Sequence, residues 1–282
     1  MRQTNLLSIG DSIQPGTYEL HSRFNRVVNF TNHGTLVSVV HKEIGAGPIN
    51  IVVENLTLDG IGAIEIENHS VIIVGSSYDF KEDRIFYSYL DFESADVDKV
   101  TKNFAFLNKA LIATSHPKSL TFLLDPDRVE NFQSTFEKAF VEKILTGVRK
   151  MTAGDVTGGV ETVHGCGFGL TPSGDDFIAG LLYGLHFSRR VFGNDCQKLI
   201  DDIYAACKRG NIFSKTFLYL AKEGAFFEKL KKLITALIDS REKEIRLCTE
   251  RLFSVGETSG ADLMTGFWAA LQTEVFGIGK SS

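Results

Sequence analysis

The sequence predicts an α+β protein in which a β-rich N-terminal domain, residues 1–92, precedes a mostly α-helical C-terminal domain, residues 93–282. In the first ninety residues, short runs of β-branched side chains alternate with turn residues, a pattern typical of strands. After about residue 93, apolar residues recur at steps of three and four, the period of an amphipathic helix. The 282 residues are 43% apolar and 23% charged, so the chain has the composition of a folded protein with a sizeable core.

The expected strands of the N-terminal domain are four runs rich in valine and isoleucine. They span residues 26–30, 35–40, 49–53 and 71–74. Glycine-containing turn segments separate them, at residues 32–34, 45–48 and 59–60. Several short strands at this spacing predict a compact β-sandwich or barrel-like module.

The expected helices of the C-terminal domain begin with residues 94–113 and 126–150, and most of the chain after Ser173 follows the same period. The second helix has a plausible start, since Asp125 can cap it and Pro126 suits the first helical position. Towards the end, residues 229–238 and 243–253 have the pattern of amphipathic helices.

Composition and charge exclude several classes of protein. The net charge is −5, and the chain lacks the basic footprint of a nucleic-acid binder. No apolar stretch is long enough to span a membrane, and the N-terminal one is too short for a signal peptide. The four cysteines are scattered, which fits neither a disulfide framework nor a zinc site. We therefore expect a cytoplasmic protein that binds neither nucleic acid nor membrane.

A glycine-rich segment from Gly154 to Gly174 interrupts the helical pattern and has no clear period. It contains seven glycines, and such density indicates backbone that closely approaches a ligand. We expect this segment to line a pocket, with Thr171, Ser173 and Asp176 at its wall. Its binding glycines would be Gly167, Gly169 and Gly174.

The segment ends in a motif that the chain repeats near its C-terminus. Residues 169–180 read GLTPSGDDFIAG and residues 256–266 read GETSGADLMTG, so that Pro172 is the only insertion. Ser173, Gly174, Asp176, Gly180 and Leu185 then align with Ser259, Gly260, Asp262, Gly266 and Leu271. We call these the first and second copies of the motif.

Two interpretations of the repeat remain open. In one, Ser-x-x-Asp is a capping box at two helix starts, and the small residues that follow let the two helices cross closely. In the other, the two starts converge on one pocket and bind small oxyanions through N–H groups and hydroxyls, including those of Thr258 and Ser259. An antiparallel pair, with the starts at opposite ends, would exclude the shared pocket.

The charge for binding a phosphate must come from outside both copies. No Lys or Arg occurs in residues 151–188 or 252–279. The expected sources are another subunit or Arg23, Arg26, Lys42 and Lys118. A divalent cation is a further possibility, because Asp155, Glu161, Asp175 and Asp176 make the first loop acidic.

Other chemistry-bearing residues give weaker signals. His164, beside the glycine run, can act as a proton donor or simply as a structural hydrogen-bonding residue. Cys166 has no visible base and is interpreted as a packing residue. There is no dinucleotide fingerprint and no P-loop, so we expect no nucleotide cofactor.

The string GLTPSGDDF at residues 169–177, with its glycine-rich approach, resembles the signature of a bacterial family long described as a domain of unknown function. Some members are labelled putative carboxylases, and one is the third subunit of oxamate carbamoyltransferase, which acts in anaerobic allantoin degradation, a part of purine catabolism. Residues 26–34, 47–48 and 211–214 look like weaker motifs of the family. Asn211 departs from the last of these, where threonines are usual before the serine at 214.

The resemblance implies transfer of a carbamoyl group between carbamoyl phosphate and oxamate, in a chain that works with other subunits or as a homo-oligomer. The expected catalytic residues are Ser173, Asp176 and His164. The expected substrate-binding residues are Gly167, Gly169, Thr171, Gly174, Asp175, Thr258, Ser259, Asp262, Asn211 and Ser214. In this scheme Ser173 and Thr171 supply hydroxyl donors, the N–H groups of Gly174 and Asp175 form an oxyanion site, and Asp176 orients the substrate or binds a metal. A regulatory subunit that binds a small carboxylate, or a scaffold, remains an alternative.

Overall fold

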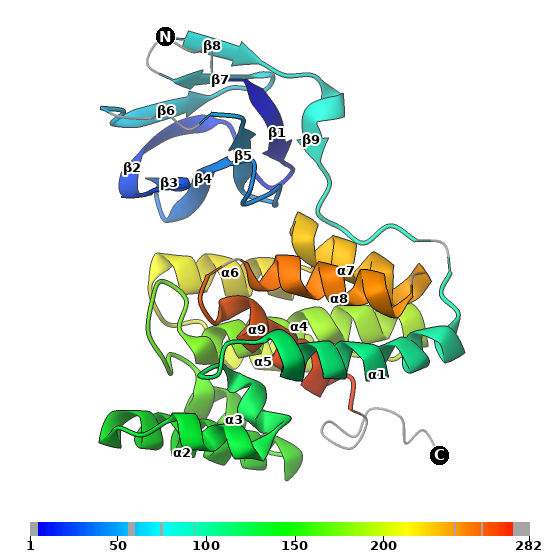
Figure 1. Cartoon of the computed structure of the whole chain (residues 1–282). Coiled ribbons are helices and arrows are strands. Elements are labelled where there is room, and N and C mark those ends of the chain that lie inside the picture. Colours follow the sequence, from blue (N-terminus) through cyan, green and yellow to red (C-terminus); the bar gives the residue numbers. More distant parts are fainter. Residues whose placement is uncertain are drawn as a thin grey trace. The chain divides into compact units, whose positions relative to one another are not determined.

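The computed structural model describes residues 5–55, 60–73, 76–92, 94–239, 241–254 and 256–272. The chain divides into two compact units (Figure 1). The first contains residues 1–90 together with residues 225–231, and the second contains residues 91–224 and 232–282. The first unit is a β-sheet and the second is mostly helical, which confirms the predicted α+β class.

The described strands of the first unit form one curled sheet with the order β8-β7-β6-β2-β3-β4-β5-β1-β9 (Figure 1). Their bounds are β1 (Leu6–Gly10), β2 (Gly16–Phe24), β3 (Val27–Asn32), β4 (Thr35–His41), β5 (Asn50–Val53), β6 (Ala63–Ile66), β7 (Ser70–Ile73), β8 (Ser76–Asp79) and β9 (Ile85–Phe86). Neighbours are antiparallel except for β4–β5 and β1–β9. One buried cluster, which includes Tyr18, Phe30 and Ile51, forms the core of this unit.

The four predicted strands correspond to β3, β4, β5 and β7, whereas the other five were not predicted. The longest of these, β2, is largely exposed and carries the polar residues Glu19, His21 and Arg23. It therefore has no run of β-branched residues that would have predicted a strand. Residues 59 and 74 of the expected turns and strands lie outside the described residues. The described strands form a single curled sheet rather than the two sheets of a sandwich, and its end strands β8 and β9 do not pair with each other.

The described helices are α1 (Val97–Thr114), α2 (Thr135–Thr152), α3 (Val156–Val163), α4 (Ser173–Phe192), α5 (Gln197–Ala206), α6 (Ile212–Lys222), α7 (Glu228–Asp239), α8 (Glu242–Phe253) and α9 (Ser259–Ala270). The helix predicted from Pro126 starts later than expected, because residues 126–131 form a 3₁₀ turn and Asp125 makes no side-chain cap. The true start is a capping box between Ser134 and Glu137.

The glycine-rich segment is less irregular than the sequence predicted, because α3 lies inside it. The Asp155 side chain caps this helix by accepting a hydrogen bond from the N–H of Gly158. A Cβ atom at Gly159 would lie 2.6 Å from the carbonyl oxygen of Gly147 in α2, so glycine is needed for close packing of α2 on α3. Capping and packing thus offset the weak helix propensity of glycine.

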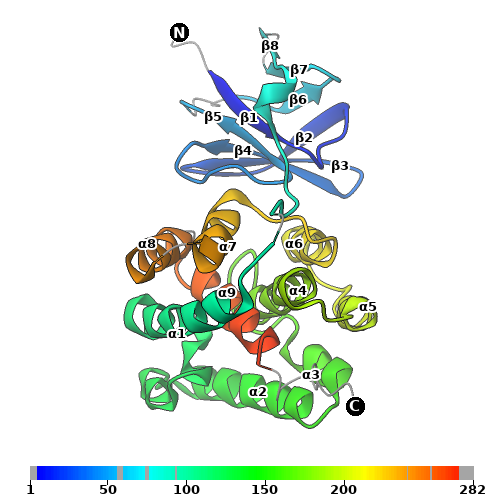
Figure 2. The same ribbon diagram turned by 90° about the vertical axis from the view of Figure 1, so that its right-hand side faces the viewer.

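Helices α4 and α9 pack directly against each other within the helical unit (Figure 2). A Cβ atom at Gly180 would lie 1.9 Å from Leu263 O, and one at Gly266 would lie 2.0 Å from Phe177 O. The next glycine along α4, Gly184, faces a later part of α9. The contacts therefore advance in the same direction along both helices, so the pair is parallel and both starts lie at the same end. This geometry excludes the antiparallel alternative and confirms that the small residues serve close helix crossing.

Candidate functional site

The two helix starts do not contain the capping boxes that the sequence predicted. Helix α4 has Pro172 at its N-cap, and the Pro172 carbonyl accepts the N–H groups of Asp175 and Asp176. Helix α9 has Thr258 at its N-cap, and neither helix has a side-chain cap hydrogen bond. The capping-box interpretation is therefore wrong for both copies, because each serine is the first helical residue and its hydroxyl serves another group.

The serine of each copy acts on the aspartate of the other copy. As hydrogen-bond donors, Ser259 and Thr171 oppose the rise in the pKa of Asp176, and Ser173 and Thr258 do the same for Asp262. Each carboxyl group thus interacts with the hydroxyl of the threonine from its own copy and with the hydroxyl of the serine from the opposite copy. This exchange brings the two starts into one polar cluster, whose aspartates 176 and 262 we call the carboxyl pair.

The carboxyl pair is almost completely buried, with relative exposures of 2% for Asp176 and 0% for Asp262. The N–H of Leu120 donates to Asp262 Oδ1 at 2.6 Å. The Oδ2 atoms of both residues have no hydrogen-bond partner among the described residues. Burial raises the pKa of Asp262 to about 7, and burial together with the charge of Asp262 raises the pKa of Asp176 well above its usual value. The pair therefore retains a proton near neutral pH.

A second ionisable pair belongs to the first copy only. His164 Nδ1 lies 2.7 Å from Asp175 Oδ1, and the Gly165 N–H donates to the same oxygen. Burial favours a higher pKa for Asp175, but hydrogen bonds from His164, Gly165 and Ser214 outweigh it and lower the pKa overall. The bond to Asp175 raises the pKa of His164 against the effect of burial. The two groups therefore favour their charged forms, unlike the carboxyl pair, and the second copy has Ala261 in place of Asp175.

The N–H groups expected to form an oxyanion site already have acceptors. The Gly174 N–H donates to the Cys166 carbonyl and the Asp175 N–H to the Pro172 carbonyl, each at 2.8 Å. The expected oxyanion role therefore has no free donor at these two groups. The Thr171 and Ser173 hydroxyls of the first copy act on the carboxyl pair instead.

Backbone geometry explains most of the glycines in the loop before α4. Gly167 and Gly169 have φ values of +113° and +93°, which other residues rarely adopt. A Cβ atom at Gly174 would lie 2.0 Å from the Val163 carbonyl oxygen. Gly165 has no neighbouring atom within 4 Å and Gly169 has its nearest one at 3.9 Å, so these two glycines face open space. The density of glycine is thus mainly a consequence of sharp turns and close packing.

Asn211 connects the glycine loop with α6. Its side chain accepts from the Ser214 N–H as the N-cap of α6, and its Nδ2 donates to the Leu170 carbonyl at 2.9 Å. The Ser214 hydroxyl is buried and helps to lower the pKa of Asp175. Asn211 therefore has a local structural role, and Ser214 lies beside Asp175.

The glycine loop carries an exposed apolar group that no sequence pattern predicted. The side chain of Phe168 is 74% exposed and that of Leu170 is 44% exposed. The ring of Phe168 lies against Phe136 of α2, with a centroid separation of 4.9 Å, and Phe136 is itself 56% exposed. An exposed apolar group of this kind is typical of a surface that contacts another molecule.

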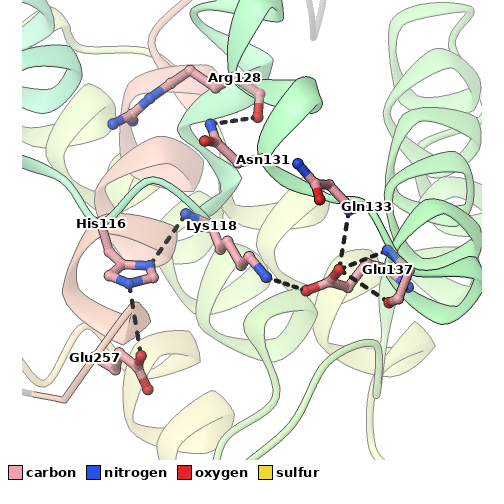
Figure 3. Close-up of polar contacts among 8 residues, drawn as sticks. His116, Lys118, Arg128, Asn131, Gln133, Glu137 and Glu257 are labelled. Atoms are coloured by element: carbon pink, nitrogen blue, oxygen red, sulfur yellow. Dashed lines mark hydrogen bonds and ion pairs between the residues drawn. The ribbon is translucent and has the colours of Figure 1, made fainter.

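Leu120, whose N–H donates to Asp262, is flanked in sequence by basic residues, in the segment before it and in the turn after it (Figure 3). The Lys118 ammonium pairs with Glu137, which lowers the pKa of that carboxyl group to about 2. His116 Nε2 lies 3.7 Å from a carboxylate oxygen of Glu257. Arg128 donates to Ser115 and Thr121. Of the predicted sources of charge, Lys118 alone belongs to the helical unit, whereas Arg23, Arg26 and Lys42 belong to the sheet unit.

The described ranges bear on metal binding, on membrane insertion and on the cysteines. Within them, no group of three or more His, Cys, Asp or Glu side chains is arranged to hold a metal ion. No described helix is both long and apolar enough to cross a bilayer. All four cysteines are free and buried, and burial raises the pKa of Cys166, so this thiol is poorly suited to be a nucleophile.

Two family models match the chain. One, described as oxamate carbamoyltransferase subunit AllH, matches residues 163–271, and the other, described as the AllH family N-terminal domain, matches residues 3–92. The first match includes both copies of the motif and the carboxyl pair. No solved structure matches the chain.

Proposed function

Since the chain belongs to the family of oxamate carbamoyltransferase subunit AllH, we propose that it takes part in carbamoyl transfer between carbamoyl phosphate and oxamate. The description of the family is that of a subunit, so we expect the chain to work with partner chains. The observation that carries the proposal is the convergence of the α4 and α9 starts, within the matched residues, around a carboxyl pair that retains a proton.

The chemistry requires hydrogen-bond donors where negative charge develops on the carbonyl oxygen. A protonated carboxyl group of the pair provides such a donor, and the four hydroxyls that donate to the pair hold its carboxyl groups in place. In the transfer, the oxamate nitrogen bonds to the carbamoyl carbon, the bond from that carbon to the phosphate oxygen breaks, and the nitrogen loses a proton. We assign that proton to the carboxyl pair, whose pKa suits exchange near neutral pH.

His164 has a supporting role in this scheme. Its Nδ1 is held by Asp175, and its side chain is only 13% exposed. A protonated imidazole at this position provides positive charge beside the acidic first copy, which itself contains no Lys or Arg. The phosphate group still requires a further cation, and Lys118 or a partner chain is our candidate source.

A non-catalytic subunit that binds a small carboxylate, or a scaffold subunit, is the second candidate function. The observations that favour it are the engaged N–H groups of Gly174 and Asp175 and the exposed rings of Phe136 and Phe168. Each indicates a part made for packing or for contact with another chain. This function would retain ligand binding or assembly but not turnover.

Calorimetric titration of the full chain with oxamate, oxalurate and carbamoyl phosphate tests the proposal. Binding is expected, and ligand at 100 times its Kd should stabilise the fold by about 2.7 kcal/mol. Ser173→Ala and Ser259→Ala should weaken binding by similar factors because the two copies exchange these hydroxyls. Asp155→Asn is the control, since asparagine caps α3 as well as aspartate does.

The outcomes separate the two functions. Binding together with turnover in the presence of the partner subunits supports the proposal. Binding that never leads to turnover with those subunits supports the non-catalytic function. Absence of binding to all three compounds contradicts a substrate site in this chain.

A further inference from the structure

We propose that the Arg209 side chain and the backbone N–H groups of residues 167–171 together bind the phosphate group of carbamoyl phosphate on the exposed glycine loop. Arg209 belongs to the segment between α5 and α6, which is bonded to this loop. The inference rests on the proposed function and names residues of this chain that provide the positive charge a phosphate needs.

The first observation is that a run of N–H groups in the glycine loop lacks acceptors. Before the run, the Gly165 N–H donates to Asp175 Oδ1 at 2.7 Å. After it, the Gly174 N–H donates to the Cys166 carbonyl at 2.8 Å. Within the described part of the chain, the N–H groups of residues 167–171 make no such bond. We call these five groups the loop amides. They place the free backbone donors in the loop, not at the start of α4.

The loop amides are accessible to a ligand from solvent. Phe168, Gly169 and Leu170 are exposed, and a Cβ atom at Gly169 would have its nearest neighbour 3.9 Å away. Gly167 and Gly169 both have positive φ values, and successive N–H groups in turns of this kind form concavities that bind anions. A phosphate therefore needs no buried cavity here, because it contacts the loop at the surface.

Two hydrogen bonds hold the segment between α5 and α6 against the glycine loop. Asn211 Nδ2 donates to the Leu170 carbonyl at 2.9 Å. The bond to Asp175 is the main cause of the raised pKa of His164, and a further bond from the ring to the Arg209 carbonyl adds to it. The segment is thus bonded to the loop at Asn211 and to the residue that precedes Gly165 at Arg209.

The Arg209 side chain is exposed and has no ion pair or hydrogen bond within the described ranges. Its positive charge opposes the rise in the pKa of His164, so the guanidinium lies near that ring. The carboxylate beside the ring, Asp175, is 1% exposed and is already paired with His164. Arg209 therefore keeps its donors for another anion, and the guanidinium fork matches the oxygens of a phosphate.

A second cation approaches the glycine loop from α2. Burial raises the pKa of the Cys166 thiol, and the Lys143 ammonium partly opposes this rise through its charge and a hydrogen bond. Lys118, by contrast, already pairs with a carboxylate. Since residues 151–188 contain no Lys or Arg, Arg209 and Lys143 bring to the loop the positive charge that it lacks.

Calorimetric titration of the full chain with carbamoyl phosphate, inorganic phosphate and oxamate tests the inference. Arg209→Gln should keep the fold, as circular dichroism will check, because the side chain is exposed and unpaired. It should weaken binding of both phosphate ligands about 10- to 100-fold, the effect of losing a charge-assisted hydrogen bond. Oxamate binding should change by less than about 3-fold. Lys143→Gln should weaken phosphate binding by a smaller factor than Arg209→Gln.

Lys208→Gln is the matched control. It removes the same charge one residue away, where the ammonium lies over the Tyr204 ring at 5.6 Å from its centroid. This variant should keep the phosphate affinity of the wild type. A loss equal to that of Arg209→Gln would indicate general attraction of anions to this surface and would overturn the inference.

Nuclear magnetic resonance locates the bound phosphate independently of any variant. In a chain labelled with ¹⁵N-glycine, inorganic phosphate should shift the amide signals of Gly167 and Gly169 more than that of Gly193. Gly193 is a suitable reference because it is also exposed and has a positive φ, but lies after α4. Shifts of equal size at the three glycines would contradict binding at the loop amides.

The remaining outcomes separate this inference from the proposed function. If the wild type binds carbamoyl phosphate and Arg209→Gln binds it equally well, the inference is overturned and the proposed function stands. Equal losses for the phosphate ligands and oxamate would also overturn the inference. If phosphate binds through Arg209 but the chain supports no carbamoyl transfer with its partner subunits, the phosphate site stands and the proposed function fails. If the wild type binds neither phosphate ligand, the inference fails, and oxamate binding decides on the substrate site.

Discussion

The two copies of the motif have the same frame but different surroundings. In both copies the helix starts at the serine, and a glycine seven residues later packs against the backbone of the partner helix. In both, the serine hydroxyl also lowers the pKa of the aspartate in the other copy. Only the first copy adds Asp175 and His164, which favour their charged forms, whereas the second has Ala261. The features that the two copies share thus create the carboxyl pair, which keeps a proton. The features that differ add the ion pair of His164 and Asp175 to the first copy alone.

The largest expected effect tests whether the carboxyl pair keeps a proton near neutral pH. Burial raises the pKa of Asp262 to about 7, so the folded protein binds this proton more tightly than the unfolded chain does. Its stability therefore falls as pH rises from about 4 to 7, by up to about 4 kcal/mol, and then levels off. Asp262→Asn removes the part of this slope that belongs to Asp262 and should be more stable than wild type at pH 8 but not at pH 4. Urea midpoints across this range measure it, and an unchanged slope would contradict a raised pKa.

The next effect concerns the helix crossing that the two copies share. A methyl group at Gly180 or at Gly266 would overlap backbone atoms of the other helix, which cannot move aside as a side chain can. Gly180→Ala and Gly266→Ala should each cost about 3 kcal/mol, although alanine is the better helix former. Similar losses from the two variants would confirm that the crossing is symmetric. Chemical denaturation measures the losses, and a stable Gly180→Ala protein would show that the crossing tolerates separation.

The sequence predicted the helix pair but not how its polar groups connect. Repetition of the motif and small residues spaced by four are local patterns, and they correctly indicated two helices in close contact. The assignment of Ser173 and Ser259 as caps failed because Ser-x-x-Asp has the same spacing in a capping box as in a first helical turn. Only the parallel packing of α4 on α9 decides which aspartate each serine meets, and the two serine–aspartate contacts span 83 and 89 residues of sequence.

Strand prediction failed for a related reason. The runs that became β3, β4, β5 and β7 are rich in β-branched residues, so composition alone revealed them. Strand β2 is polar and largely exposed, and it is ordered by its two neighbours β3 and β6. The exposed Phe168 and the contact of Leu120 with Asp262 likewise depend on tertiary packing, and no local pattern marked them.

A smaller effect tests whether His164 and Asp175 are both charged. The Asp175 carboxylate stabilises the fold above its usual pKa and loses this contribution as pH falls through its lowered value. The raised pKa of His164 means that its contribution is complete below about 6.5 and is lost as pH rises through the raised value. Asp175→Asn should therefore cost about 2 kcal/mol near pH 5 and less at pH 8. As pH rises, the loss of stability caused by Asp175→Asn should become smaller, whereas the gain of stability from Asp262→Asn should become larger. Urea midpoints at both pH values measure these changes.

The smallest expected effect distinguishes a capping serine from an exchanged one. Ser134 is a true cap, so Ser134→Ala should lose about 1 kcal/mol at any pH between 5 and 8. Ser173 and Ser259 cap nothing, so Ser173→Ala and Ser259→Ala should change stability by less than about 0.5 kcal/mol at pH 5. At pH 8 a modest further loss is expected for Ser173→Ala, because its hydroxyl lowers the pKa of Asp262 and helps to support the ionised form. Thermal and urea unfolding of the three variants at both pH values measure these changes. A loss at pH 5 equal to that of Ser134→Ala would restore the capping role, whereas a loss confined to high pH would tie the serine to the carboxyl pair.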